Sequence, residues 1–234
     1  MTTSHSLEFT FITAQGKTQR SVPVANAIIA GWTARDVAAM EHHIVELEAI
    51  GVPRPKRTPM YYRVAARRVT TVDRIQAVGG DSSGEVEFIV VNAGGQLWVG
   101  AGSDHTDRKV ETYGITVSKQ MCDKPVAQYL WPLAEVEAHW DRLLLRSRVI
   151  INGNTSTYQD GSVASMRRPH ELIAQYEKEF GRFGDESLMF CGTLAAIGGI
   201  RPAQRFEFEL IDPVLDRSIA HGYDIETLPI AELE

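Results

Sequence analysis

Two glutamates separated by one residue, Glu85 and Glu87, open an apolar stretch of the sequence. On a β-strand alternate side chains face the same side, so both carboxylates would share one face about 7 Å apart, and the intervening Val86 would face the other way. Two anionic oxygens placed in this way could close on one hard cation. Solvated strand faces have the same pattern, and Glu207 and Glu209 repeat it as a comparison for that alternative.

A third carboxylate, Asp104, follows after one predicted hairpin. Carboxylate oxygens with positions left for water or substrate suit Mg²⁺ or Mn²⁺, whereas Zn²⁺ prefers sulfur or imidazole. Asp104 could equally be a turn residue after Gly102. His105 and Asp107 flank it and would point away from it in an extended segment, so we expect them to support the site rather than bind the metal.

The segments around these residues have the periodicity of strands and helices. Alternating or apolar runs predict a hairpin around Gly16 and further strands, at Leu7–Phe11, Val22–Val24, Glu85–Val91, Gln96–Gly100, Arg148–Asn152 and Arg205–Ile211. Helical spacing predicts amphipathic helices over Thr33–Ile50, with Thr33 as the cap, and over Pro169–Phe180. The residues between the first predicted helix and Gly84 are irregular and basic. Because strands and helices do not alternate regularly, an α+β fold with a large, mostly antiparallel or mixed sheet is favoured.

The composition suits a folded protein and excludes several classes of partner. The chain has 234 residues, 44% hydrophobic and 23% charged, and its formal net charge of -6 argues against broad attraction to nucleic acid or anionic membranes. No run approaches the roughly 20 apolar residues of a membrane helix and no signal peptide is apparent, so we expect a cytoplasmic protein. The basic stretch Arg54–Arg68 indicates mostly a solvated face. Cys122 and Cys191 are expected to be reduced thiols, with Cys191 buried rather than nucleophilic.

Several segments, in order, resemble motifs of the fumarylacetoacetate hydrolase superfamily. The first three are similar to its Glu-x-Glu metal motif, its Asn-Asp-x-Ser-Ala-Arg segment and its Gly-Lys-Ser-x-Asp loop, at Glu85-Val86-Glu87, Ser103-Asp104-His105-Thr106-Asp107-Arg108 and Lys119 with Asp123. The most specific run comes later, at Asn152-Gly153, Gln159-Asp160-Gly161-Ser162, Met166 and Glu171-Leu172-Ile173-Ala174, followed by Gly192-Thr193. The likeness spans Gly84 to Leu228. It implies an α+β fold of the mixed β-sandwich or β-roll type with flanking helices.

The resemblance also implies site residues. The metal ligands for Mg²⁺ or Mn²⁺ would be Glu85, Glu87 and Asp104. The catalytic group would be a His-x-x-Glu pair on an N-terminal helix, together with a lysine, at His43, Glu46 and Lys119; positions i and i+3 of a helix can reach one water. Substrate contacts would come from Arg63, Arg108, Glu111 and Thr193. Exposed roles for the His43–Glu46 pair and for Arg63 stay open as alternatives.

Some positions depart from the family pattern and indicate an outlying branch. Glu111 stands where many relatives carry a substrate-binding glutamine, and Leu194 replaces the proline after Gly-Thr. Residues 1–84 would form a hairpin, a helix and a basic lid-like segment, and residues 85–234 the catalytic core, within one compact domain.

The activity implied by the resemblance is hydrolytic cleavage of a C–C bond in a 2,4-dioxo acid, of acylpyruvate or fumarylpyruvate type, through an enolate held at the metal. Decarboxylase, isomerase or dehydratase chemistry on a 2-oxo acid uses the same enolate and is the alternative. A non-catalytic small-molecule-binding protein on the same fold is the second alternative. The implied partners are a small anionic oxo acid and a second copy of the chain in a homodimer.

Overall fold

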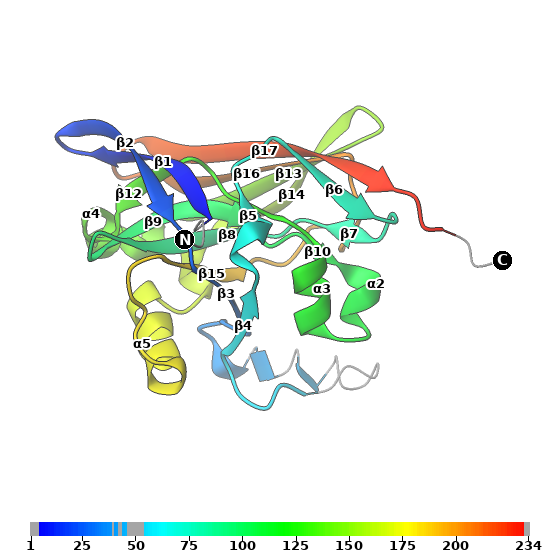
Figure 1. The fold of residues 1–234 in the computed structure, drawn as a ribbon, viewed down its shortest axis with the longest axis horizontal. Helices are drawn as coiled ribbons and strands as arrows, with labels where there is room; N and C mark the ends of the chain where they lie inside the picture. The colour runs from blue at the N-terminus through cyan, green and yellow to red at the C-terminus, as the bar shows by residue number, and fades with distance from the viewer. Residues whose placement is uncertain (1–4, 39, 42–43, 46–53, 232–234) are drawn as a thin grey trace.

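A computed structural model describes residues 5–38, 40–41, 44–45 and 54–231 of the chain, and its main elements are two large β-sheets (Figure 1). Among these residues the larger sheet has eight strands, in the order β2 (Gly16–Pro23), β1 (Ser6–Thr13), β12 (Tyr129–Pro132), β9 (Gln96–Ser103), β8 (Val86–Ala93), β15 (Ser187–Thr193), β3 (Asn26–Gly31) and β4 (Met60–Val64). The smaller sheet has five, in the order β14 (Asn154–Ser162), β13 (Leu144–Ile151), β16 (Arg205–Asp212), β17 (Arg217–Leu228) and β6 (Arg74–Val78).

Short strands and helices complete the described part of the chain. Two further pairs join β10 (Thr106–Asp107) to β7 (Ser82–Ser83), and β11 (Lys124–Pro125) to β5 (Val69–Thr70). Besides the described helical residues at 37–38, 40–41 and 44–45, the helices are α2 (Arg108–Glu111), α3 (Ile115–Met121), α4 (Leu133–Val136) and α5 (Pro169–Phe180), with 3-10 turns at Ala66–Arg68, Glu137–Arg142 and Val163–Ser165. In Figure 1 the smaller sheet runs along the upper side, and α5, α2 and α3 lie below the larger sheet. No helix in the described segments has the length and apolar character needed to span a bilayer.

Strand β8 shows how the core is divided. Its side chains alternate between two apolar clusters: Val86 and Phe88 pack in the cluster shared with the smaller sheet, while Ile89 lies in the cluster enclosed by the larger sheet. Strands from both ends of the larger sheet contribute to that second cluster, with Val22 from β2 and Tyr62 from β4. The sheet therefore curls, and the fold is the predicted α+β roll packed against a second sheet.

Most of the predicted elements are confirmed. The first hairpin turns at Gly16, each predicted strand overlaps an observed one, and α5 has the bounds Pro169–Phe180 that were predicted. The sheet is mixed, because β1 pairs with β12 and β15 pairs with β3 in parallel while the other pairs of the larger sheet are antiparallel. Cys122 and Cys191 are buried and not bonded to each other.

Two local predictions were wrong. The segment before Gly84 is not irregular, since it supplies β4 to the larger sheet and β6 to the smaller one. The described helical residues of the first predicted helix begin at Val37, and the carboxylate of Asp36 accepts from the backbone N–H of Ala38 at 2.9 Å, so Asp36 rather than Thr33 occupies the capping position. The buried Thr33 instead accepts a hydrogen bond at its carbonyl from Arg167.

Candidate metal centre

Three carboxylates meet at the open end of the β8–β9 hairpin. Glu85, Glu87 and Asp104 each offer an oxygen, and these atoms all lie within 4.8 Å of one another. The hairpin positions them because Glu87 pairs with Gly102 across the strands and the backbone N–H of Asp104 donates to the carbonyl of Glu85 at 3.0 Å. Glu87 and Asp104 are 3% and 0% exposed, whereas Glu85 is only partly buried. The cluster therefore has a buried interior, and its edge at Glu85 is more accessible to solvent.

Two lysines neutralise Asp104. Lys119, from α3, donates to the Asp104 carboxylate, and the fully buried Lys124 lies 3.3 Å from its Oδ1 and donates to the carbonyl of His105. Burial opposes ionisation of Asp104, but the charges of Lys119 and Lys124 outweigh it and lower its pKa to about 2. Burial likewise opposes the charged form of Lys119, and the charges of Asp104 and Glu85 outweigh it and raise its pKa. Burial lowers the pKa of Lys124.

Glu87 is held by the backbone of β15. The N–H of Gly192 donates to Glu87 Oε2 at 2.6 Å. Gly192 has φ +104°, and a Cβ there would lie 1.8 Å from Oγ1 of Thr33, so both its backbone conformation and the close packing require glycine. Burial raises the pKa of Glu87, and the negative charge of Asp104 raises it further. Without a cation the proton therefore binds Glu87 more tightly than an ordinary glutamate.

Arg108, the first residue of α2, joins the cluster to Glu111 at the end of that helix. Its Nε donates to the hydroxyl of Ser83 at 2.7 Å, Nη1 donates to Glu111 at 3.1 Å, and Nη2 lies 3.2 Å from Glu85. Burial opposes the charge of Arg108, but Glu85 and Glu111 outweigh it and raise the pKa of the guanidinium. Arg108 is thus a permanent cation held between two carboxylates.

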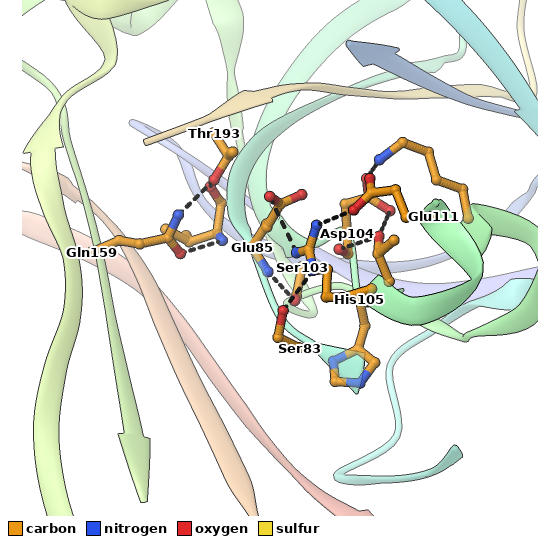
Figure 2. Close-up of polar contacts among 12 residues, drawn as sticks. Ser83, Glu85, Ser103, Asp104, His105, Glu111, Gln159 and Thr193 are labelled. Atoms are coloured by element: carbon orange, nitrogen blue, oxygen red, sulfur yellow. Dashed lines mark hydrogen bonds and ion pairs between the residues drawn. The ribbon is translucent and has the colours of Figure 1, made fainter. Parts of the chain in front are cut away.

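Gln159 ties the site to the smaller sheet. Its Oε1 accepts from the N–H of Val86 and from Ser147, both at 2.9 Å. Its Nε2 donates to the carbonyl of Leu194 at 2.6 Å and to Thr193 at 2.7 Å, the latter drawn in Figure 2. The Thr193 hydroxyl in turn donates to the carbonyl of Val86 at 2.7 Å. In this structure Thr193 therefore holds β15 against the start of β8.

His105 faces away from the carboxylates and belongs to a buried polar network (Figure 2). Its Nδ1 lies 2.9 Å from the hydroxyl of Tyr223 and its Nε2 lies 2.9 Å from Ser82. Tyr223 also hydrogen-bonds Ser103, which accepts from the backbone N–H of Glu85. Burial and the charge of Lys124 lower the pKa of His105 to about 3, so the ring is neutral and supports the hairpin end that carries Asp104.

The remaining predicted residues are not joined to this cluster by the contacts described. Arg63 is exposed on β4 and donates to Asn26 at 2.7 Å, while the preceding Tyr62 is buried with its ring 5.9 Å from the Lys119 ammonium. His43 and Glu46 lie outside the described residues. Their roles, like those of the other predicted site residues, stay predictions.

Two residues were missed when site residues were assigned from the sequence. Lys124 gave no signal, because a lysine is almost never fully buried and nothing in its neighbours marks it. Gln159 did give one: it begins the Gln-Asp-Gly-Ser segment of the resemblance, but its sequence alone does not reveal that it bonds to β8 and β15.

The donor set fits a hard divalent cation. Among the residues that the structure describes, all three converging groups are carboxylates, with no sulfur or imidazole ligand atom beside them. A buried glutamate, Glu87, lies beside the like charge of Asp104, which is the repulsion that a bound cation would relieve. Glu85, Glu87 and Asp104 are therefore the residues that would hold Mg²⁺ or Mn²⁺.

Comparison with solved structures shows the class of fold. A Burkholderia cenocepacia protein provisionally named a fumarylpyruvate hydrolase is 17% identical, with a TM-score of 0.59 over 98% of this chain and 99% of that one. A yeast fumarylacetoacetate hydrolase family protein is 16% identical, with a TM-score of 0.60 over 89% and 95%. A 2-keto-3-deoxy-D-arabinonate dehydratase is 15% identical, with a TM-score of 0.60 over 90% and 77%. The fold is that of the fumarylacetoacetate hydrolase superfamily, as the sequence motifs predicted.

The sequence itself places the chain in a narrower group. The chain belongs to the family described as "Protein of unknown function (DUF2848)", whose match covers residues 30–223. No curated protein matches the sequence. Low identity to the solved structures together with this separate family agrees with an outlying branch of the fold.

Proposed function

We propose that this chain is a divalent-metal-dependent enzyme that hydrolyses a C–C bond of a 2,4-dioxo acid, of the acylpyruvate or fumarylpyruvate type. The observation that carries the proposal is the convergence of Glu85, Glu87 and Asp104 within 4.8 Å, two of them buried, beside the cations Lys119 and Arg108. An acidic cluster on a solvated surface would lack this burial and these charged neighbours.

The three carboxylates would hold Mg²⁺ or Mn²⁺. When bound, the cation would supply Lewis acidity to a 2-oxo acid that chelates it through its carboxylate and oxo oxygens. Burial of Glu87 and Asp104 excludes water from one side of the site, so charge interactions there are stronger than in solvent.

The basic groups would stabilise negative charge that develops on the substrate. Lys119 is buried and stays protonated, because Asp104 and Glu85 raise its pKa, so its ammonium can neutralise an oxyanion without taking up a proton first. Arg108, Thr193, Glu111 and Arg63 are proposed as substrate contacts, with Arg108 at the more accessible edge of the cluster. His43, oriented by Glu46, is proposed as the base that activates water, and His43→Ala should then remove activity without removing metal binding.

The test is metal-dependent turnover. Acetylpyruvate, fumarylpyruvate and oxaloacetate would be offered to the wild type, to Glu87→Ala and to Glu209→Ala with Mg²⁺ or Mn²⁺. We expect turnover of a dioxo acid by the wild type and Glu209→Ala, and a loss of at least about a hundredfold in Glu87→Ala, since it removes a metal ligand. Equal turnover by all three proteins would contradict the proposal.

A lyase acting on a 2-oxo acid is the second candidate, and the similarity of the fold to that of a 2-keto-3-deoxy-D-arabinonate dehydratase supports it. Turnover in ¹⁸O-labelled water separates the two. Label in the new carboxylate of the released acid supports hydrolysis, whereas turnover without label in any carboxylate supports a lyase or isomerase. A protein that binds neither cation would support a non-catalytic binding role on the same fold.

A further inference from the structure

Glu111 is a carboxylate of the site that does not belong to the converging metal ligands. It is the last residue of α2, a helix capped by Asp107, whose carboxylate accepts from the N–H of Val110 at 2.9 Å. From there Glu111 reaches back to Arg108, 3.1 Å from Nη1. Its side chain is 30% exposed, against 16% for Arg108 and 0% for Asp104, so Glu111 lies toward the solvent side of the cluster.

The site has more carboxylates than positively charged side chains. Among the described residues, the ion pairs join three cations, Arg108, Lys119 and Lys124, to three carboxylates, Glu85, Asp104 and Glu111. Glu87 adds a fourth carboxylate, since its partner is the uncharged N–H of Gly192. With these seven groups ionised and a divalent cation bound, the groups and the cation together carry a single positive charge.

One positive charge is balanced by one carboxylate of a substrate. A second carboxylate would enter a partly buried site whose cations are already paired, and it would meet Glu111 at the accessible edge. Two like unit charges closer together than the Debye length at the edge of a protein repel strongly enough to change binding by about tenfold.

We propose that Glu111 makes this site selective for monoanionic 2-oxo acids, those with an uncharged tail, over dianionic ones. The inference rests on the proposed function and deepens it, because it selects the acylpyruvate type over the fumarylpyruvate type. Glu111 is the group to which this selectivity is assigned because it adds negative charge without being one of the three converging carboxylates.

The test uses two ligands that differ only in the distal carboxylate, 2-oxopentanoate and 2-oxoglutarate. Calorimetric titration of the Mn²⁺-loaded protein gives the dissociation constant of each ligand without any turnover. The wild type should bind 2-oxopentanoate more tightly. Glu111→Gln keeps an oxygen that can accept from Arg108 but removes the charge, so it should move the ratio of the two constants about tenfold toward 2-oxoglutarate.

Glu207→Gln is the matched control, because it removes one carboxylate charge from the opposite sheet, where Glu207 pairs with Arg205. Its ratio should equal that of the wild type. An unchanged ratio in Glu111→Gln, an equal shift in Glu207→Gln, or a wild type that prefers 2-oxoglutarate would overturn the inference while leaving the proposed metal enzyme intact. A wild type that does not bind Mn²⁺ would overturn the proposed function, and the inference with it.

Discussion

The chain contains the same Glu-x-Glu pattern on two strands, and the structure gives the two pairs opposite environments. Glu87 is buried and Glu85 partly buried, and both converge with Asp104. Glu207 and Glu209, on β16, are partly exposed, with Arg205 2.9 Å from Glu207 and Arg146 3.4 Å from Glu209. The Glu-x-Glu pattern on a strand predicts only that the two carboxylates share a face. The neighbouring elements decide whether that face is a solvated surface or a site.

The partners of the two pairs differ in the same way. On β16 each carboxylate meets an arginine at the surface of the smaller sheet, and such exposed pairs contribute about 0–1 kcal/mol to stability. Beside Glu85 and Glu87, the lysines Lys119 and Lys124 are buried with Asp104, so each charge there depends on the others. Substitutions matched between the two regions test this contrast.

The largest difference is expected on removing one cation from each region. Lys119→Met leaves the carboxylates of the buried cluster short of a positive charge and should lower the free energy of unfolding by about 3–5 kcal/mol. Arg205→Met removes a partner of Glu207 and should lower it by less than about 1 kcal/mol. Urea denaturation of both metal-free variants measures the two values. Similar losses of unfolding free energy in both variants would contradict the contrast between the buried cluster and the exposed pair.

A smaller difference is expected at the glycine next to each pair. Gly192→Ala forces a Cβ to 1.8 Å from Oγ1 of Thr33 at a positive φ and should destabilise the protein by about 2–3 kcal/mol. In Gly222→Ala the Cβ would meet the flexible end of Arg205 and the side chain of Glu207, so a loss of about 1 kcal/mol or less is expected. The melting temperatures of the two variants measure this difference in stability. A Gly192→Ala protein as stable as the wild type would show that the backbone around Glu87 is not tightly constrained.

The smallest effect is a pH dependence of stability that the buried Glu87 should cause. The pKa of Glu87 is raised above its ordinary 4.5 in the folded protein, so its contribution to stability is fully present below that pH and is lost as the pH rises through the folded value. The metal-free wild type should therefore lose up to about 1.4 kcal/mol per pH unit in that window. Asp104, whose pKa is lowered to about 2, loses its contribution only at lower pH.

Glu87→Gln should flatten this dependence, and Glu209→Gln should retain it. Denaturation midpoints between pH 5 and pH 8 in the presence of a chelator give the slopes. If stability depends on pH with the same slope in Glu87→Gln as in the wild type, a group other than Glu87 causes the dependence.

Much of the fold and part of the site could be predicted from the sequence. Periodicity was sufficient for the first hairpin, for β8 and β9, and for α5, because each element carries its own alternating or helical pattern. The convergence of Glu85, Glu87 and Asp104 followed from one hairpin that brings both strand ends together. These are local relationships, which a sequence records directly.

The contacts that could not be predicted are those made between distant segments. Thr33 was interpreted as a helix cap because its type suits one, but it lies against Gly192, more than half the chain away. Lys124 is buried beside Asp104 only because β11 pairs with β5. Gln159 bridges the two sheets through its hydrogen bonds to Val86 and Thr193, and no spacing within its own segment indicates that.

Direct measurement of Mn²⁺ binding tests the central claim, that Glu85, Glu87 and Asp104 form a metal site whereas Glu207 and Glu209 form a solvated face. Calorimetry, or the electron paramagnetic resonance signal of the free ion, would give the Mn²⁺ affinity of three proteins: the wild type, Glu87→Gln and Glu209→Gln. We predict one site per chain in the wild type and in Glu209→Gln with the same affinity, and an affinity at least about a hundredfold weaker in Glu87→Gln. Equal binding by all three proteins, or no binding by the wild type, would contradict the account.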